Sequence, residues 1–305
     1  MKKMVLTVIL SVIAAFAADA QKSIFTESDM KAFSAVNISD EFVVTLKESE
    51  DYVLKTNIDE RIDSYVAAYV KDGVLYLDIE RKKFTPELKK ALRNVHGKNP
   101  VIEAEIWAPF LKSVIISGNA AITGSDDIKT DSFELNASDK ASVANMEVIC
   151  KTAEVKVSKG AEVDVEINAS SDLSFSSAGT SKTFINVKAN SLTLASSGSS
   201  TVEAVVDVAD MKVDNSGMSN VKVVSGKTGS LQVDASGSAK FNSGDVVIPT
   251  AYMIQSGSSK SLVNVSDTLK VNLVGNSTLE FKDNPYIDLE RIVSSTLTRY
   301  SESSK

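Results

Sequence analysis

Cysteine and histidine are almost absent from this sequence of 305 residues, which holds only Cys150 and His96. A single cysteine excludes an internal disulfide, so the fold must be stabilised by packing. One cysteine and one histidine do not make a zinc site by themselves, and they exclude a Ser-His-Asp relay unless His96 is its base. Cys150 follows Val148 and Ile149, which favours a small buried apolar residue over a reactive thiol.

Long apolar runs are also scarce. The clearest one follows Lys2 and Lys3, extends to about Ala18 and ends in the small residues of Ala18-Asp19-Ala20. This pattern predicts a cleaved signal peptide over residues 1–20, and hence export to the periplasm or the cell surface. An uncleaved anchor is the alternative. No later stretch is long and apolar enough to cross a membrane, so we expect no transmembrane segment.

Basic residues are outnumbered by acidic ones. The formal charge of -7 becomes -8 without residues 1–20, which leaves 31 basic against 39 acidic side chains. A modest acidic excess gives solubility and argues against nucleic acid as a partner. Proline is scarce whereas valine, serine and threonine are plentiful, which is typical of an all-β chain.

Residues 21–110 are predicted to form a strand-rich N-terminal part. Short alternating runs occupy 42–46 and 52–56, and residues 101–109 return to the same alternation. Two β-type runs, 65–70 and 74–79, flank Lys71-Asp72-Gly73, and Asp-Gly between such runs predicts a hairpin.

A basic insertion over residues 81–99 interrupts these strands. Pro86–Arg93 is predicted to form a short helix with proline in its first turn. One hypothesis is a patch that docks a partner, such as an acidic glycan or an anionic headgroup. The alternative is a solvated insertion with Leu88 and Leu92 against the sheet, and charge runs are more often of this second kind. The candidate partner-binding residues are Lys82, Lys83, Lys89, Lys90 and Arg93.

Residues 111–305 contain a repeat with a period near 20, which is typical of a solenoid. Leu192–Gly198 and Leu231–Gly237 are two clear copies, each a short strand that runs into a glycine. Taking that glycine as the reference, successive copies lie 18–21 residues apart. The reference positions are Gly118, Asp139, Lys159, Gly179, Gly198, Gly217, Gly237, Gly257, Gly275 and Val293.

Further columns support this alignment. Two residues after the reference, every copy has alanine or serine, and four residues after it most copies are apolar. In two copies the apolar residue, Phe184 or Leu262, falls one place later. Positions four and six residues before the reference are also mostly apolar, as in Leu192 and Leu194. Glycine at the reference permits a positive φ. Lys159 tolerates that conformation poorly, so we expect Gly160 to shift the turn there.

These columns predict an all-β fold, a right-handed parallel β-helix of about ten coils of about 20 residues with a C-terminal cap. Side chains alternate inward and outward, so stacked coils bury a shared core that no single coil can bury. The right hand follows from the general preference of parallel crossovers and not from the period. A β-sandwich or meander is the alternative.

The order of motifs resembles a known family. These motifs are Phe33–Ser39, Phe42–Leu46, Val70–Leu77, Ile102–Pro109 and Leu111–Gly118, followed by coils that contain Ser-Gly. The order is similar to the auto-transporter adhesin family with a head GIN domain, a domain of unknown function common in Bacteroidetes. The resemblance implies an exported β-helical protein with an adhesin role. It implies no catalytic residues, and the insertion at 81–99 departs from the family pattern.

The leading hypothesis for function is a non-catalytic adhesin, binding or scaffold protein of the cell envelope, with a glycan or an envelope or host-surface protein as partner. The alternative is a carbohydrate-active enzyme, because β-helices also carry polysaccharide lyases and hydrolases. Such an enzyme would need carboxylates on neighbouring coils. Scattered acids on a solenoid face are usually solubilising, and we expect no catalytic residue, metal or cofactor. The acidic candidates for the alternative are Asp126, Asp127 and Asp131, or Asp164 and Glu166.

Overall fold

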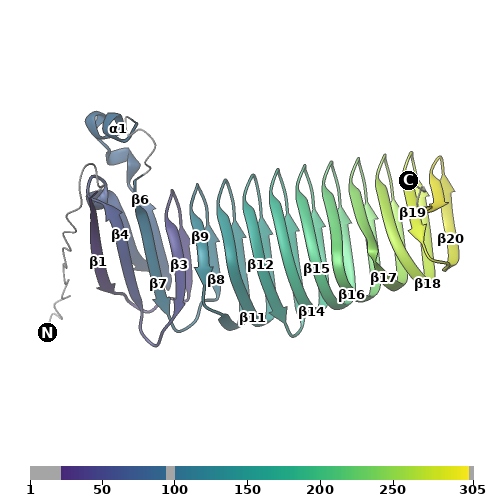
Figure 1. Ribbon diagram of the computed structural model, residues 1–305, viewed down its shortest axis with the longest axis horizontal. Coiled ribbons are helices and arrows are strands. Elements are labelled where there is room, and N and C mark those ends of the chain that lie inside the picture. The colour runs from purple at the N-terminus through teal and green to yellow at the C-terminus, as the bar shows by residue number, and fades with distance from the viewer. Residues whose placement is uncertain (1–21, 94–99, 302–305) are drawn as a thin grey trace.

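The computed structural model describes residues 22–93 and 100–301. These residues form a long rod of stacked coils, and every strand belongs to one continuous sheet (Figure 1). Apart from the first few strands, neighbouring strands run parallel. The protein is therefore a parallel β-solenoid, as the repeat predicts. The direction in which the coils wind stays a prediction. The predicted signal peptide, residues 1–20, lies outside the described residues.

The N-terminal part holds the irregular elements and the one α-helix of the described chain. Its helix α1 spans Pro86–Arg93, as predicted, and two short 3-10 helices span Asp63–Tyr65 and Arg81–Lys83. Its strands are β1 (Ser23–Asp29), β2 (Ala35–Ile38), β3 (Val43–Glu48), β4 (Val53–Asp59), β5 (Val66–Lys71), β6 (Val74–Ile79) and β7 (Ile102–Ala108).

In the described part of the repeat region, residues 111–301, all the regular elements are strands. Many of them span 15 or 16 residues, because each bends around one edge of the rod and lies on both walls. They are β8 (Ser113–Ile116), β9 (Ala121–Ser125), β10 (Ile128–Ala137), β11 (Ser142–Val157), β12 (Glu162–Ala169), β13 (Asp172–Ser177), β14 (Lys182–Ser196), β15 (Thr201–Asn215), β16 (Asn220–Ala235), β17 (Lys240–Gln255), β18 (Lys260–Val274), β19 (Thr278–Lys282), β20 (Tyr286–Val293) and β21 (Thr296–Arg299).

The coils at the N-terminal end do not follow the order of the sequence. The β2–β3 coil lies between two later ones, because β2 pairs with both β6 and β8, and β3 pairs with both β7 and β9. The β6–β7 coil is therefore nearer the end of the rod than the coil that precedes it in the chain. The sheet also runs without interruption past residues 110 and 111, where the sequence predicts a boundary between two parts.

Antiparallel strands cover this end of the rod. Strand β4 pairs antiparallel with β7, and β1 pairs antiparallel with β4. On the other wall, β5 and β6 form the hairpin predicted across Asp72-Gly73, where both residues have positive φ. Switching from parallel to antiparallel pairing ends the stacking of coils and blunts the exposed edge.

The reference positions stack into a column of tight turns along one edge of the rod. Glycine suits the close approach in this column: a Cβ on Gly198 would come within 2.9 Å of the backbone oxygen of Gly179 on the preceding coil. In the same column, the amide of Ser199 donates to that oxygen at 2.7 Å. Two expectations about this column are wrong. Lys159 itself has a φ of 61°, so Gly160 does not shift the turn, and in the last copy Ser294 rather than Val293 has the positive φ.

The column two residues after the reference lies inside the rod, fully buried from Ala120 to Ser277. Buried hydroxyls need hydrogen-bond partners, and two of its serines find one on the preceding coil. The hydroxyl of Ser200 donates to the carbonyl oxygen of Ser177, and that of Ser219 to the carbonyl oxygen of Ser196, each at 3.2 Å. The small residues of this column let neighbouring turns approach closely.

The apolar column two residues further on is also buried, but Phe184 and Leu262 are not part of it. Thr183 and Ser261 occupy the inward position in those coils, while Phe184 points outward and is 39% exposed. The reason is register, because Thr183 pairs with Val163 on one side and Val202 on the other. A shift of one residue would turn all the inward side chains of that strand outward and all the outward ones inward.

Candidate ligand-binding groove

A short linker passes over one coil and leaves an aromatic ring exposed. Because the β2–β3 coil lies between β7 and β9, residues 109–112 have to advance by two coil spacings, roughly 10 Å, between β7 and β8. The amide of Lys112 donates to the carbonyl oxygen of Ser34 at 2.7 Å and holds the linker against β2. Pro109 precedes Phe110, whose side chain is 41% exposed.

The Phe110 groove is an open channel of about 800 Å³ beside this linker, where strands β10 and β11 bend from one wall to the other. Exposed apolar groups, Phe110 and Ile149, stand beside lysines from three successive coils. The lining residues are Phe110, Lys112, Lys129, Thr130, Asp131, Ile149, Cys150, Lys151 and Ser170.

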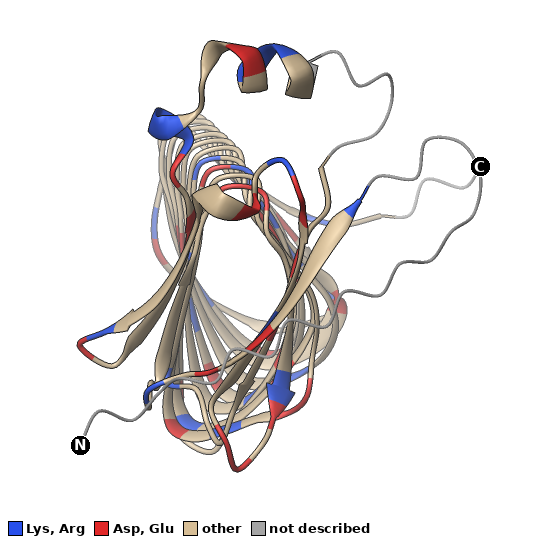
Figure 2. Cartoon of the chain, turned by 90° about the vertical axis from the view of Figure 1, so that its left-hand side faces the viewer, with Lys and Arg blue, Asp and Glu red and all other residues tan. Residues whose placement is uncertain are grey.

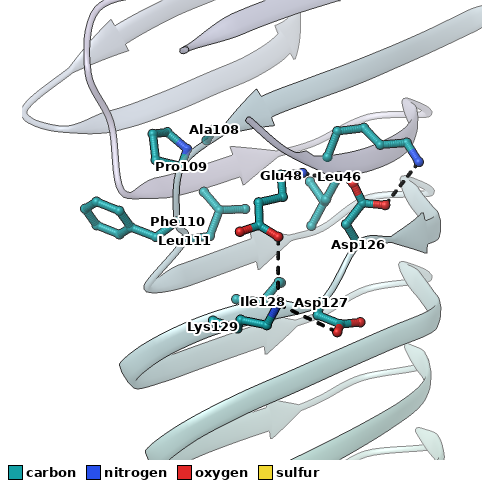
Figure 3. A pocket seen from close by; sticks show the side chains of 11 residues that line it. Leu46, Glu48, Ala108, Pro109, Phe110, Leu111, Asp126, Asp127, Ile128 and Lys129 are labelled. Atoms are coloured by element: carbon teal, nitrogen blue, oxygen red, sulfur yellow. Dashed lines mark hydrogen bonds and ion pairs between the residues drawn. The ribbon is translucent and has the colours of Figure 1, made fainter. Parts of the chain in front are cut away.

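The lysines of the groove are weakly paired. The Lys112 ammonium lies 5.6 Å from the centre of the Phe110 ring. Lys129 Nζ lies 3.9 Å from a carboxylate oxygen of Glu48 and 3.9 Å from one of Asp127, at the outer limit of an ion pair (Figure 3). Long ion pairs between exposed groups contribute little stability, so an incoming anion can compete for these ammonium groups.

A smaller hollow adjoins the groove and shares Phe110 and Lys129 with it. Asp126 lies at the edge of this hollow and pairs with Lys47, whose Nζ lies 3.2 Å from Oδ1, and the Glu48 amide donates to Oδ2 at 3.0 Å. The Glu48 amide and Lys47 together hold the pKa of Asp126 below its ordinary value of 3.8. An ionised, saturated carboxylate is a poor general acid.

The low pKa of Asp126 predicts a pH dependence of stability. Because the folded-state pKa is lower than the unfolded one, the carboxylate stabilises the fold above about pH 4, and this contribution fades as the pH falls through the folded pKa. Asp126→Asn should therefore lower the Tm at pH 6 by more than at pH 3. Thermal melts of both proteins across this range measure the difference. A Tm difference that stays constant with pH would contradict it.

The acidic residues singled out in the sequence do not converge. Asp131 lines the Phe110 groove, whereas Asp126 and Asp127 line the adjoining hollow. Asp164 lies on one wall beside Phe184 in a separate hollow, and Glu166 pairs in register with Glu147. Within residues 22–93 and 100–301, no three His, Cys, Asp or Glu side chains are placed to hold a metal ion.

Cys150 is buried, as predicted, although it borders the groove. Burial raises the pKa of its thiol, so the group stays protonated at neutral pH. A protonated, inaccessible thiol is a poor nucleophile. The other residue with this chemistry, His96, lies outside the described residues.

The basic insertion stands at the N-terminal end, where helix α1 lies outside the coil (Figures 1 and 2). The first residue of the insertion is anchored to the coil, since Arg81 Nε donates to Asp40 Oδ1 at 2.9 Å and Arg81 also contacts Glu41. Leu88 and Leu92 pack against the core. Lys82, Lys83, Lys89 and Lys90 are exposed, and Lys83 pairs with Glu80 at 2.6 Å. The side chain of Arg93 is not among the described parts of the chain. The docking role of this patch stays a prediction.

Several groove residues carried no signal in the sequence. Phe110 and Lys112 lie on the linker, Ile149 and Lys151 lie on β11, and the two pairs meet only because their coils stack. A phenylalanine directly after the proline that ends a strand was the one available hint. The departure of the linker from the spacing of the repeat was not visible, because the sequence does not show that the β2–β3 coil is inserted between two others.

The fold and the groove together define a class of protein, a parallel β-solenoid with an open, aromatic and basic groove on one edge. The chain belongs to the family described as "Putative auto-transporter adhesin, head GIN domain", whose model matches residues 32–183 and 156–285. The resemblance in the order of motifs is thereby confirmed. No curated relative matches the chain. In the described residues, no helix is long and apolar enough to span a membrane.

Three solved structures are similar to the chain at low identity. A "putative adhesin" from Parabacteroides merdae is 16% identical, with 92% of this chain and 97% of that chain covered and a TM-score of 0.44. A "Putative lipid binding protein" from Parabacteroides distasonis is 14% identical, with 91% and 96% covered and a TM-score of 0.47. A "putative adhesin" from Bacteroides fragilis is 16% identical, with 92% and 98% covered and a TM-score of 0.45.

Proposed function

We propose that this protein is an exported, non-catalytic binding protein of the cell envelope, adhesin-like in role, that holds an acidic glycan in the Phe110 groove. The observation that carries the proposal is one exposed aromatic ring among lysines of three successive coils. A sugar ring can lie on the apolar face of Phe110, while the ammonium groups of Lys112, Lys129 and Lys151 bind its carboxylate or sulfate groups.

The same groove gives little support to catalysis. Glycoside hydrolysis needs two carboxyl groups at a fixed separation, one of them with a raised pKa. In this region the pKa of Asp126 is lowered and its oxygens are occupied by Lys47 and the Glu48 amide. The carbohydrate-active alternative would be supported if the protein shortened an acidic polysaccharide, which size-exclusion analysis of the polysaccharide after incubation detects.

Binding to immobilised glycans tests the proposal. We expect the mature chain to bind uronic acid or sulfated oligosaccharides and not their neutral counterparts. Affinity should fall with added salt, because the contacts are between exposed charges. Phe110→Ala and Lys112→Ala should each weaken binding about tenfold, the equivalent of roughly 1.4 kcal/mol.

Phe25→Ala is the matched control. It removes a phenylalanine that is more exposed than Phe110, 55% against 41%, from β1 at the end of the rod and should leave binding unchanged. Equal losses in Phe25→Ala and Phe110→Ala would contradict the assignment of the site. Binding to vesicles that contain an anionic lipid, with no binding to any glycan, would assign the groove to a lipid headgroup instead.

A further inference from the structure

At the C-terminal end of the rod, apolar side chains in core-facing positions of the last coil are exposed. All eight residues of β20 are exposed, among them Tyr286, Ile287, Leu289 and Ile292. Ile287 and Leu289 pair in register with Leu269 and Val271, which are fully buried. They therefore occupy inward positions of the last coil, and a further layer would bury them.

The backbone of this last coil also forms sheet hydrogen bonds on its inner side alone, as far as the described residues show. Strand β20 pairs with β18, and β21 pairs with β19, and within residues 22–93 and 100–301 neither has a partner on its outer side. A row of free amides and carbonyls beside apolar side chains is a template for another strand. The opposite end differs, because β4 and β1 cover it with antiparallel pairing and β1 carries Glu27 and Asp29.

The sequence of β20 is complementary to itself in antiparallel pairing. With Asp288 of one copy opposite Arg291 of the other, Ile287 faces Ile292 and Tyr286 faces Val293. Each of these pairs lies on one side of the sheet, because Ile287 and Ile292 are inward while Asp288 and Arg291 are outward. The register places two Asp–Arg pairs and two Ile–Ile pairs across the junction.

A bulge at the centre of β20 makes this possible. The register with β18 shifts between Leu289 and Arg291, so Glu290 is the extra residue. Glu290 is held on the outer wall, where it accepts from Tyr252 Oη at 2.8 Å and lies 2.7 Å from Lys270 Nζ. Without the bulge, Ile287 and Ile292 would lie on opposite sides of the strand, since side chains alternate.

We propose that two copies of this chain associate end to end through their C-terminal coils, with β20 pairing antiparallel to β20 of the second copy. The two-fold axis then also brings the two β21 strands together on the opposite wall. The junction continues the sheet on both walls and buries Ile287, Leu289 and Ile292 of each copy between the two end coils. Such an isologous contact closes on itself, so it makes dimers and not filaments.

Reversal of the charged pair tests this arrangement. Light scattering coupled to size-exclusion chromatography should give a concentration-dependent dimer for the wild-type chain. Asp288→Arg places Arg opposite Arg, and Arg291→Asp places Asp opposite Asp. Each single change should weaken the dimer at least about tenfold, because like charges across a contact are unfavourable. The double variant Asp288→Arg/Arg291→Asp restores opposite charges and should restore the dimer.

Lys188→Asp on β14 is the matched control. It makes the same change of charge as Arg291→Asp, on an exposed residue remote from the end of the rod. It should leave the dimer unchanged. Circular dichroism and the Tm separate a folding defect from a loss of association, and recovery in the double variant cannot come from a misfolded end. A monomer at every concentration would overturn the proposal. So would a dimer that is insensitive to residues 288 and 291.

Discussion

Phe175→Ala is expected to lower the free energy of unfolding by about 3–5 kcal/mol, the usual cost of removing a large buried side chain. Phe175 lies on β13, 1% exposed, with Val155 and Leu194 at the same position of the neighbouring coils. The cavity cannot close easily, because the backbones of both neighbouring coils are fixed by hydrogen bonds in register. Urea denaturation followed by circular dichroism measures the loss.

Phe184→Ala is the control on the next coil. It removes the same side chain from the outer wall, where Phe184 is 39% exposed, and should change the free energy of unfolding by only about 0.5 kcal/mol. Because the repeat columns alone would place Phe184 inside, the pair of variants measures the register directly. Equal losses in the two variants would show that β14 is displaced by one residue.

Gly226→Ala is the second substitution with a large expected effect, a loss of about 3 kcal/mol. Gly226 has a φ of 111° at the place where the register between β15 and β16 shifts. A Cβ there would overlap the carbonyl oxygen of Val206 on the preceding coil. Overpacking costs about 1–3 kcal/mol, and the left-handed backbone adds about 1–2. The urea midpoint of the purified variant measures the loss.

Gly73→Ala separates the two causes. Gly73 also has a positive φ, 75°, in the turn between β5 and β6, but an added Cβ would meet no atom within 4 Å. Only the backbone strain remains, so the expected loss is about 1 kcal/mol. If Gly73→Ala were as damaging as Gly226→Ala, the close approach of neighbouring coils would not be the cause.

Local patterns in the sequence were sufficient for the elements and for most of the core. The Asp72-Gly73 turn, the helix that begins at Pro86 and the inward columns around Leu192 and Leu231 follow from rules that act over a few residues. A period near 20 adds the solenoid, because a coil that repeats cannot bury its core except against its neighbours. These features needed no knowledge of distant contacts.

The errors occurred where a neighbouring coil overrides a local preference. Lysine is a poor residue for positive φ, yet Lys159 adopts it because the turns of its neighbours set the backbone. Phenylalanine is a better core residue than threonine, yet Thr183 faces inward because pairing with β12 and β15 sets the register. In both cases the hydrogen bonds of a whole strand outweigh the preference of one side chain.

The sequence by itself determined that this chain is an all-β solenoid with an apolar interior, since the repeat, the alternation and the turn glycines are local and periodic. Only the tertiary structure decided which coils are neighbours. It inserted the β2–β3 coil between β7 and β9 and thereby exposed Phe110 beside Lys129 and Lys151. It also left the inward side chains of β20 uncovered. The physical reason is that strand pairing joins segments far apart in the chain, and nothing in a 20-residue period states which segment pairs with which.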